Sequence, residues 1–272
     1  MLRTIEIKQS VFADNNREAE SLRAELKGKG LFLLNLMSSP GSGKTTTLVR
    51  TIEALRDELR IGIMEADIDS DVDAHTVQNA GAKAVQLHTG GMCHLTADMT
   101  RQGLEALGTE DVDIAILENV GNLVCPAEFD TGASKSAMIL SVPEGDDKPL
   151  KYPLMFTVCD CLIVNKIDVL PYFDFDFDAM CERAKKLNPN IEIIPISAKT
   201  GEGVDKLLEM IASRLDSGSR RVELRIPYDK GGLLDQLYRE AKVESVEYGE
   251  TIAVTAVCTP KVLGQMAPFI AE

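Results

Sequence analysis

The most constraining feature of the sequence is the segment 38–45, which reads SSPGSGKT and follows the apolar run 31–37. A continuous apolar run is typical of a strand buried on both faces. The residues 45–59 that come next carry apolar side chains at helical spacing. A glycine-rich turn between a buried strand and a helix is the usual place of a phosphate-binding loop. The sequence therefore predicts a nucleotide-binding domain built around this loop.

The residue types in this loop suit the oxygens of a bound nucleotide. Gly41 and Gly43 let backbone N–H groups close around the β-phosphate, Lys44 reaches the β- and γ-oxygens, and the hydroxyl of Thr45 is a ligand for Mg²⁺. The standard pattern begins with glycine, whereas this chain has Ser38 there. A chance Gly-Lys-Thr is the alternative, and the strand–loop–helix context argues against it. The predicted phosphate-binding residues are Ser39, Gly41, Ser42, Gly43, Lys44, Thr45 and Thr46.

Apolar runs alternate with helical segments along the rest of the chain. We expect strands at 61–64, 84–87, 114–117, 161–164 and 191–196. We expect helices at 12–27, 73–80, 95–107, 178–187 and 204–215. Strands that alternate with helices predict an α/β fold with a mostly parallel, doubly wound sheet.

The composition changes at 216–219 (Asp-Ser-Gly-Ser), which we interpret as a linker. A small α+β domain of β-α-β-β order is expected after it, with a strand at 222–226, a helix at 232–241 and a hairpin of 243–248 with 251–258. Because a unit of about 50 residues is too short to be very stable alone, it is expected to dock on the main domain. The expected domains are an N-terminal extension and helix at 1–28, the nucleotide-binding domain at 29–216 and the C-terminal domain at 221–272.

A guanine-binding motif follows the buried run 161–164. The carboxylate of Asp168 can accept hydrogen bonds from N1–H and the N2 amine of guanine, a pair of donors that adenine lacks. Asn165 and Lys166 are expected to brace this loop and cover the base. A further backbone donor to guanine O6 is expected from Ser197, Ala198 and Lys199. Because these motifs and the phosphate loop occur in the right order, each after a strand, the sequence predicts GTP as the nucleotide.

The segment 118–121 stands where phosphate-switch GTPases have Asp-x-x-Gly. Glu118 is then the acid that holds Mg²⁺, and the N–H of Gly121 meets the γ-phosphate. A strand-terminal acid without a role is the alternative. Together with Lys44, these residues form the predicted catalytic group, and no general base is identified.

A cluster of acids occupies 65–73, with five carboxylates in nine residues. Such a cluster repels itself unless a cation or solvent intervenes. The functional interpretation is a switch segment that senses Mg²⁺, with Asp67 the best-placed ligand and a member of the catalytic group. The alternative is a solvated loop with a helix N-cap at Asp71 or Asp73.

A second kind of metal site is suggested by Cys93 and His94, with Cys125 about 30 residues later. Thiolate and imidazole suit Zn²⁺ or Ni²⁺ and suit Mg²⁺ poorly. Three such ligands leave a fourth position for exchange or for a second subunit. The alternative is core cysteines and a surface histidine. The position of Cys125, four residues after Gly121, favours a metal site that responds to the nucleotide.

The remaining cysteines and histidines are expected to be structural. Cys159 and Cys161 alternate on a predicted strand and should share one buried face. Core packing is also expected for Cys181 and Cys258. His75 is expected on a solvated helix face, and His88 is not expected to join the metal site.

The charge argues against nucleic-acid binding. The chain has 29 Lys and Arg against 43 Asp and Glu, a formal net charge of −14, and lacks a long basic cluster. No stretch approaches the ~20 apolar residues of a membrane span, and the N-terminus does not read as a signal peptide. We therefore expect a cytoplasmic protein, and six cysteines in a reducing compartment are expected to be free thiols.

Four stretches together resemble the HypB family, the nickel-incorporation GTPases that help to mature [NiFe] hydrogenases. They are LNLMSSPGSGKTT at 34–46, TGGMCHL at 89–95, ENVGNLVCPAEFD at 118–130 and EGDDKP at 144–149. The resemblance covers about 16–215, and the serine at position 38 is usual in this family.

The resemblance implies a P-loop GTPase of the SIMIBI type that hydrolyses GTP to GDP and phosphate. It also implies a GTP-dependent homodimer whose interface carries a metal site at Cys93, His94 and Cys125. Hydrogenase maturation proteins are the implied partners. The chain lacks the N-terminal Cys-rich or His-rich nickel tract of some members.

The segment 221–272 extends past the usual end of that family and resembles the small C-terminal domain of HflX-type GTPases. HflX-type proteins are ribosome-associated, but this segment has six Lys or Arg against eight Asp or Glu, so contact with rRNA is not expected. The extension also allows another nickel enzyme as the client. The competing hypothesis is a regulatory GTPase switch that acts on a protein partner through 221–272, with structural cysteines. A nickel or zinc storage protein is disfavoured by the scarcity of His and Cys.

Overall fold

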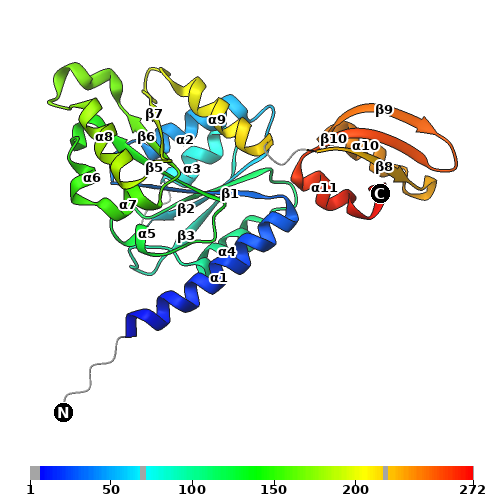
Figure 1. The fold of residues 1–272 in the computed structure, drawn as a ribbon, viewed down its shortest axis with the longest axis horizontal. Helices are drawn as coiled ribbons and strands as arrows, with labels where there is room; N and C mark the ends of the chain where they lie inside the picture. The colour runs from blue at the N-terminus through cyan, green and yellow to red at the C-terminus, as the bar shows by residue number, and fades with distance from the viewer. Residues whose placement is uncertain (1–6, 68–71, 217–219, 272) are drawn as a thin grey trace, which may run out of the picture. The chain divides into compact units, whose positions relative to one another are not determined.

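The computed structural model describes residues 7–67, 72–216 and 220–271. It divides into two compact units (Figure 1). The first comprises Met1–Arg23 and Leu33–Leu208, and the second comprises Ala24–Phe32 and Glu209–Glu272. The domain boundaries expected at 28/29 and 216/221 stay predictions of the sequence, and most of the expected linker, 217–219, lies outside the described residues.

The first unit contains a seven-stranded sheet, within the described residues, in the order β3-β2-β4-β1-β5-β6-β7. Its strands are β1 (Phe32–Ser38), β2 (Ile61–Asp67), β3 (Lys83–His88), β4 (Ile114–Glu118), β5 (Lys135–Ser141), β6 (Cys161–Asn165) and β7 (Glu192–Pro195). The pairs β2–β3, β2–β4, β1–β5, β5–β6 and β6–β7 are parallel. The predicted parallel α/β sheet is confirmed. Because parallel strands end at the same edge, the loops after β1, β4, β6 and β7 come together there.

Helices lie on both sides of this sheet (Figure 1). They are α1 (Ile7–Lys29), α2 (Lys44–Leu55), α3 (Val72–Ala80), α4 (Ala97–Leu107), α5 (Cys125–Glu128), α6 (Lys148–Lys151), α7 (Pro153–Val158), α8 (Phe177–Leu187) and α9 (Val204–Asp216). Two 3₁₀ turns, Val142–Glu144 and Ile167–Tyr172, follow β5 and β6. Compared with the predicted ends, α1 begins earlier and α2 ends earlier, at Leu55 instead of residue 59.

The strand β5 was not predicted, although it lies between β1 and β6 in the middle of the sheet. Its apolar run, 137–140, is only four residues long and is preceded by Lys135 and Ser136. A run this short does not distinguish a strand from a helix or a loop. Its central place comes from long-range pairing with Leu34–Ser38 of β1, which the local sequence does not encode.

One prediction about the cysteines is wrong in its geometry. Cys159 does not lie on a strand with Cys161: it is the C-cap residue of α7, whereas Cys161 begins β6. The chain turns at Asp160, so the assumed alternation does not exist. Core packing is nevertheless confirmed, since Cys159, Cys161 and Cys258 are buried, and the half-buried Cys181 packs against a core cluster. His75 is exposed on α3, as predicted.

The second unit contains a three-stranded antiparallel sheet, within the described residues, in the order β8-β10-β9. Its elements are β8 (Arg220–Ile226), a 3₁₀ turn (Tyr228–Lys230), α10 (Gly232–Glu240), β9 (Lys242–Tyr248), β10 (Ile252–Cys258), α11 (Pro260–Met266) and a 3₁₀ turn (Ala267–Phe269). The expected β-α-β-β order is confirmed, and α11 is added to it. This sheet has its own apolar core, in which Leu224, Leu237 and Met266 are buried. No helix among the described residues is both long enough and apolar enough to cross a membrane.

Candidate nucleotide and metal site

The predicted phosphate loop connects β1 to α2 at the carboxyl edge of the sheet. Gly41 and Gly43 have positive φ angles of 74° and 97°, which glycine adopts without strain. A Cβ atom at Gly43 would lie 2.4 Å from Nδ2 of Asn165, so any side chain at this position would also clash with Asn165. The hydroxyl of Ser42 is buried and makes no hydrogen bond within the described residues. A buried hydroxyl without a protein partner is expected where a polar ligand supplies the missing hydrogen bond.

The side chain of Asn165 joins three of the predicted motifs. Its Nδ2 donates to the carbonyl of Ser42 at 2.9 Å, in the phosphate loop. Its Oδ1 accepts from the backbone N–H of Lys166 at 2.7 Å and of Ala198 at 3.1 Å. The phosphate loop and both guanine loops are therefore held by one carboxamide.

Lys166 contacts the phosphate loop, a contact that the sequence analysis did not specify. Its Nζ donates to the carbonyl of Gly41 at 2.6 Å. It has a φ of 63°, which is uncommon outside glycine and is found where surrounding contacts impose it. Its role over the base stays a prediction.

The predicted guanine acceptor has a defined orientation. One carboxylate oxygen of Asp168 accepts from the hydroxyl of Ser197 at 2.7 Å, and that hydroxyl accepts from the N–H of Thr200 at 3.1 Å. Arg50 of α2, which the sequence analysis did not single out, donates to the carbonyls of Ala198 and Lys199 at 3.1 and 3.3 Å. A basic residue on the helix after a phosphate loop has no distinctive spacing, so the motif alone does not point to it.

Two buried carboxylates lie side by side near the phosphate loop. Glu118 ends β4 and is paired in register with Glu65 of β2, and they are 3% and 2% exposed. Oxygen donors from Glu118 and Thr45 suit Mg²⁺. Asp67 ends β2, but its side chain lies outside the described residues, as does that of Asp73. Asp71, with the rest of 68–71, also lies outside them.

Gly121 packs against the phosphate loop. A Cβ atom at this position would lie 3.2 Å from Cγ of Pro40 and 3.5 Å from Nζ of Lys44. The backbone of Gly121 is therefore close to the lysine that is predicted to reach the γ-phosphate. This closeness fits the predicted switch role of the glycine.

The residues of the predicted soft-metal site come together from two loops. The sulfur atoms of Cys93 and Cys125 are 2.8 Å apart, and Sγ of Cys93 is 3.8 Å from Nδ1 of His94. The ring of His94 stacks on Phe129, with centroids 3.7 Å apart. Within the part of the chain that the structure describes, no set of three His, Cys, Asp or Glu side chains is arranged to hold a metal ion. His88 lies at the exposed end of β3.

The chemistry of these groups depends on their surroundings. The hydrogen bond with Cys93 raises the pKa of the Cys125 thiol. Burial lowers the pKa of the His94 imidazole, and the carboxylate of Glu128 opposes that shift. A neutral imidazole can ligate a metal directly, whereas the thiols must lose protons when they bind one.

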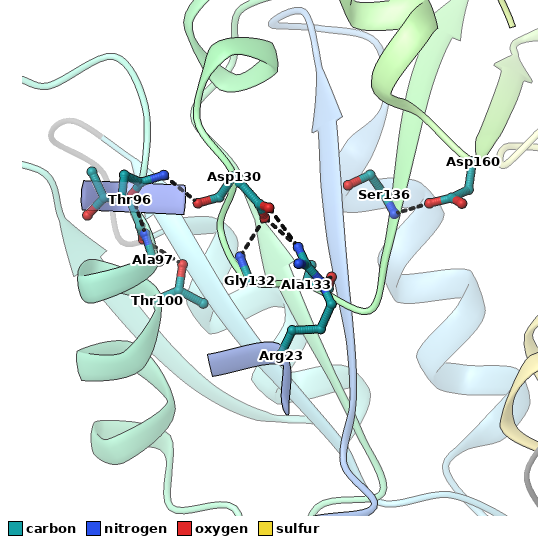
Figure 2. A network of polar contacts seen from close by, with 10 residues as sticks. Arg23, Thr96, Ala97, Thr100, Asp130, Gly132, Ala133, Ser136 and Asp160 are labelled. Atoms are coloured by element: carbon teal, nitrogen blue, oxygen red, sulfur yellow. Dashed lines mark hydrogen bonds and ion pairs between the residues drawn. The ribbon is translucent and has the colours of Figure 1, made fainter. Parts of the chain in front are cut away.

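A cleft of about 420 Å³ lies beside these residues, between α1 and the segment 126–136. Its walls include Arg23 of α1, Phe129, Lys135 and Asp160. Two ion pairs lie in its lining, since Arg23 binds Asp130 and Lys135 binds Asp160 at 2.5 Å. The N–H of Ser136 donates to the same Asp160 carboxylate (Figure 2).

Comparison with protein-family models gives two matches. Residues 32–195 match the CobW/HypB/UreG nucleotide-binding domain. Residues 179–259 match the HflX C-terminal domain.

Similar curated proteins carry one recurring description. The hydrogenase maturation factor HypB of Azotobacter chroococcum mcd 1 is 46% identical over 209 residues, which are 77% of this chain and 68% of that protein. HypB of Escherichia coli (strain K12) is 44% identical over 212 residues, 78% and 73% of the two chains. The hydrogenase/urease maturation factor HypB of Helicobacter hepaticus is 39% identical over 216 residues, 78% and 88% of the two chains.

Two solved structures have the same fold as the first unit. HypB from Helicobacter pylori, in complex with nickel, is 36% identical with a TM-score of 0.70 and covers 74% of this chain and 94% of its own. HypB from Archaeoglobus fulgidus is 38% identical with a TM-score of 0.69 and covers 74% of this chain and 98% of its own.

Proposed function

The chain belongs to the HypB family of CobW/HypB/UreG nucleotide-binding proteins, and from this premise we propose that it is a metallochaperone that delivers nickel to a [NiFe] hydrogenase or another nickel enzyme. As a family member it is a P-loop GTPase that converts GTP to GDP and phosphate. The proposal adds that hydrolysis is coupled to a homodimer and to a metal site at Cys93, His94 and Cys125. The expected setting of this work is the cytoplasm, with hydrogenase maturation proteins as partners.

The observation that carries the proposal is the contact between Cys93 and Cys125. Their sulfur atoms are 2.8 Å apart, although the residues are 32 positions apart in the chain. Cys93 is exposed, so its thiol can be reached by a metal ion and by a partner protein. Two soft donors in contact suit Ni²⁺ or Zn²⁺. Exposed apolar side chains, Met92 (40%) and Val124 (51%), flank the pair and fit a surface that a second subunit covers.

In the proposed reaction the base is selected by Asp168 and the phosphates are held by residues 39–46. Lys44 stabilises charge on the β- and γ-phosphates, and Thr45 with Glu118 and Asp67 would hold Mg²⁺. When bound, Mg²⁺ neutralises charge on the phosphate oxygens. Gly121 packs against Pro40 and Lys44 of the phosphate loop, so its N–H would meet the γ-phosphate and would register its loss on hydrolysis.

Nickel is the cargo of the proposed cycle. A single chain presents two thiols and a stacked imidazole, and a homodimer formed with GTP would bring a second such set to the same ion. Loss of the γ-phosphate would then loosen the dimer and the site together. The cargo would pass to a maturation partner or to the client enzyme.

The test is a titration of Ni²⁺ and of Zn²⁺ into the full chain without nucleotide, with GDP and with a non-hydrolysable GTP analogue. Analytical ultracentrifugation of the same samples reports the oligomeric state. Cys93→Ala should lose tight binding in every nucleotide state. Cys181→Ala, a half-buried cysteine of α8, is the matched control and should bind as the wild type does. Weak binding that is indifferent to both Cys93 and the nucleotide would rule out the coupled metallochaperone.

A second candidate function is a regulatory GTPase switch that acts through the C-terminal unit. The match of 179–259 to the HflX C-terminal domain and the separate core of this unit favour it. In that case a protein captured by the GTP form should require 221–272 and should still bind to Cys93→Ala. Loss of capture in Cys93→Ala would favour the metallochaperone instead.

A further inference from the structure

Asn122 contacts both cysteine-bearing loops at once. Its Nδ2 donates to the carbonyl oxygen of Cys93 at 2.6 Å. Its Oδ1 accepts from the backbone N–H of Val124 and of Cys125, both at 2.9 Å. One carboxamide therefore links the main chain at the first cysteine to the main chain at the second.

The chemistry of these bonds is specific to a carboxamide. An aspartate could accept from the two N–H groups but could not donate to the carbonyl of Cys93. An alanine could do neither, and would leave those backbone groups to water. The side chain thus ties two segments that are separated by 32 residues in the sequence.

Asn122 is also joined to the nucleotide end of the molecule. Its backbone N–H donates to the carbonyl of Val120 at 2.8 Å, which closes a tight turn around Gly121. Gly121 in turn lies against Pro40 and Lys44 of the phosphate loop. A shift of Gly121 toward or away from a γ-phosphate must move the adjacent Asn122.

The other ends of both segments are fixed independently. Asn15 of α1 accepts from the N–H of Ala97 at 3.0 Å and donates to the carbonyl of Asp130 at 2.9 Å. Its side chain is buried with both bonds made. Movement that starts at Gly121 is therefore confined to the stretches between these anchors, which include the two cysteines.

We propose that Asn122 is the positioning residue that transmits the nucleotide state from Gly121 to Cys93 and Cys125 together. The inference rests on the proposed function and deepens it, because it names the contact through which the metal site and the phosphate loop are coupled. The relative position of the two sulfur atoms then depends on the nucleotide. The affinity for a thiophilic divalent cation follows that position.

The experiment compares Ni²⁺ affinity at saturating GDP and at a saturating non-hydrolysable GTP analogue, by competition with a chelator. It uses the full-length wild type, Asn122→Ala and Asn122→Asp. Asn190→Ala is the matched control, since Asn190 is exposed and its side chain has no role in the argument. The thiolate-to-nickel charge-transfer absorbance of each sample reports sulfur coordination independently of turnover.

In the wild type and in Asn190→Ala the two affinities should differ, by roughly 5- to 150-fold if the coupling is of ordinary size. In Asn122→Ala and Asn122→Asp the ratio should fall to within about twofold of one. The charge-transfer spectrum should then stop changing with the nucleotide. If either Asn122 variant folds with the wild-type circular dichroism and keeps the wild-type ratio, the inference is wrong.

The failure of the inference is distinguishable from the failure of the proposed function. If the wild type depends on the nucleotide, Cys93→Ala abolishes binding and the Asn122 variants behave as the wild type, only the transmission through Asn122 is overturned. If the Ni²⁺ affinity of the wild type is the same with GDP and with the GTP analogue, both the coupled metallochaperone and the inference are wrong.

Discussion

Arg23 of α1 holds the carboxylate of Asp130 at both oxygens, with its Nη2 atom 2.6 and 2.8 Å from them. Its Nε donates to the carbonyl of Ala133 at 2.9 Å (Figure 2). The N–H of Gly132 caps the same carboxylate at 2.9 Å. The helix before the phosphate loop is therefore attached to the segment that leads from α5 to β5. This segment begins at Phe129, four residues after the proposed metal ligand Cys125.

The first prediction concerns the buried Asn15. Asn15→Ala leaves the N–H of Ala97 and the carbonyl of Asp130 without their partners, at a cost of about 1–3 kcal/mol. Thermal and denaturant unfolding should show the loss. Asn16→Ala, an exposed neighbour on the same helix, should unfold as the wild type does. Equal stabilities of the two variants would show that the buried asparagine does not anchor these segments.

A second prediction separates two effects of adding a Cβ atom in the phosphate loop, which are backbone strain at positive φ and a steric clash with a neighbouring side chain. Gly41→Ala introduces only a side chain at positive φ, with no atom within 4 Å of the new Cβ. Gly43→Ala adds a collision with Nδ2 of Asn165, 2.4 Å away. We expect about 1–2 kcal/mol of destabilisation from the first and clearly more from the second, measured by urea unfolding. Matching losses in the two variants would contradict the close approach of Asn165.

The third prediction tests the guanine assignment. Asp168→Asn replaces an acceptor with a donor that faces the donor groups of guanine, so GTP affinity should fall, by roughly one to two orders of magnitude. Xanthosine triphosphate presents an oxygen in place of the N2 amine, and its affinity relative to GTP should rise. Fluorescent-nucleotide competition measures both. Asp174→Asn, an exposed acid in the following loop, should preserve the wild-type preference.

The fourth prediction concerns thiol reactivity. Burial raises the pKa of the Cys159 thiol, so the thiolate that reacts with iodoacetamide is scarce at pH 8. Cys93 is exposed and should be alkylated first in the native protein. Mass spectrometry after timed quenching measures the order, and all six cysteines should react after denaturation. Alkylation of native Cys159 as fast as Cys93 would contradict the described core.

The nucleotide-binding loops were predictable because their chemistry is local. Gly43, Lys44 and Asp168 belong to short motifs, and each motif directly follows a buried apolar run. The parallel sheet places the ends of these runs at one edge, so sequence order was enough to group the loops. The roles proposed for these side chains toward GTP remain predictions.

The connections between loops were not predictable in the same way. Asn15 and Asp130 are 115 positions apart, and Arg23 and Asp130 are 107 apart. A single asparagine or arginine on a helix is common, and its partner is decided only when the chain is folded. Asn122 was easier to notice from the sequence, because it lies between Gly121, the predicted switch glycine, and Cys125. Nothing in its spacing, however, indicated a bond to Cys93. The mistaken strand at Cys159 has a similar origin, since Asp160, where the chain turns, binds Lys135 and Ser136, which are 25 and 24 positions away in the sequence.

The bonds of Asn15 and Asn122 end on main-chain atoms, and none of them involves sulfur. The side-chain amides of these two asparagines thus hold the backbone of the two cysteine-bearing segments in place, and these bonds do not need a bound metal ion. In a zinc finger the departure of the metal removes the fold itself. In the proposed cycle a departing ion would take only its own coordination bonds with it, so an emptied carrier would be refilled without first having to refold.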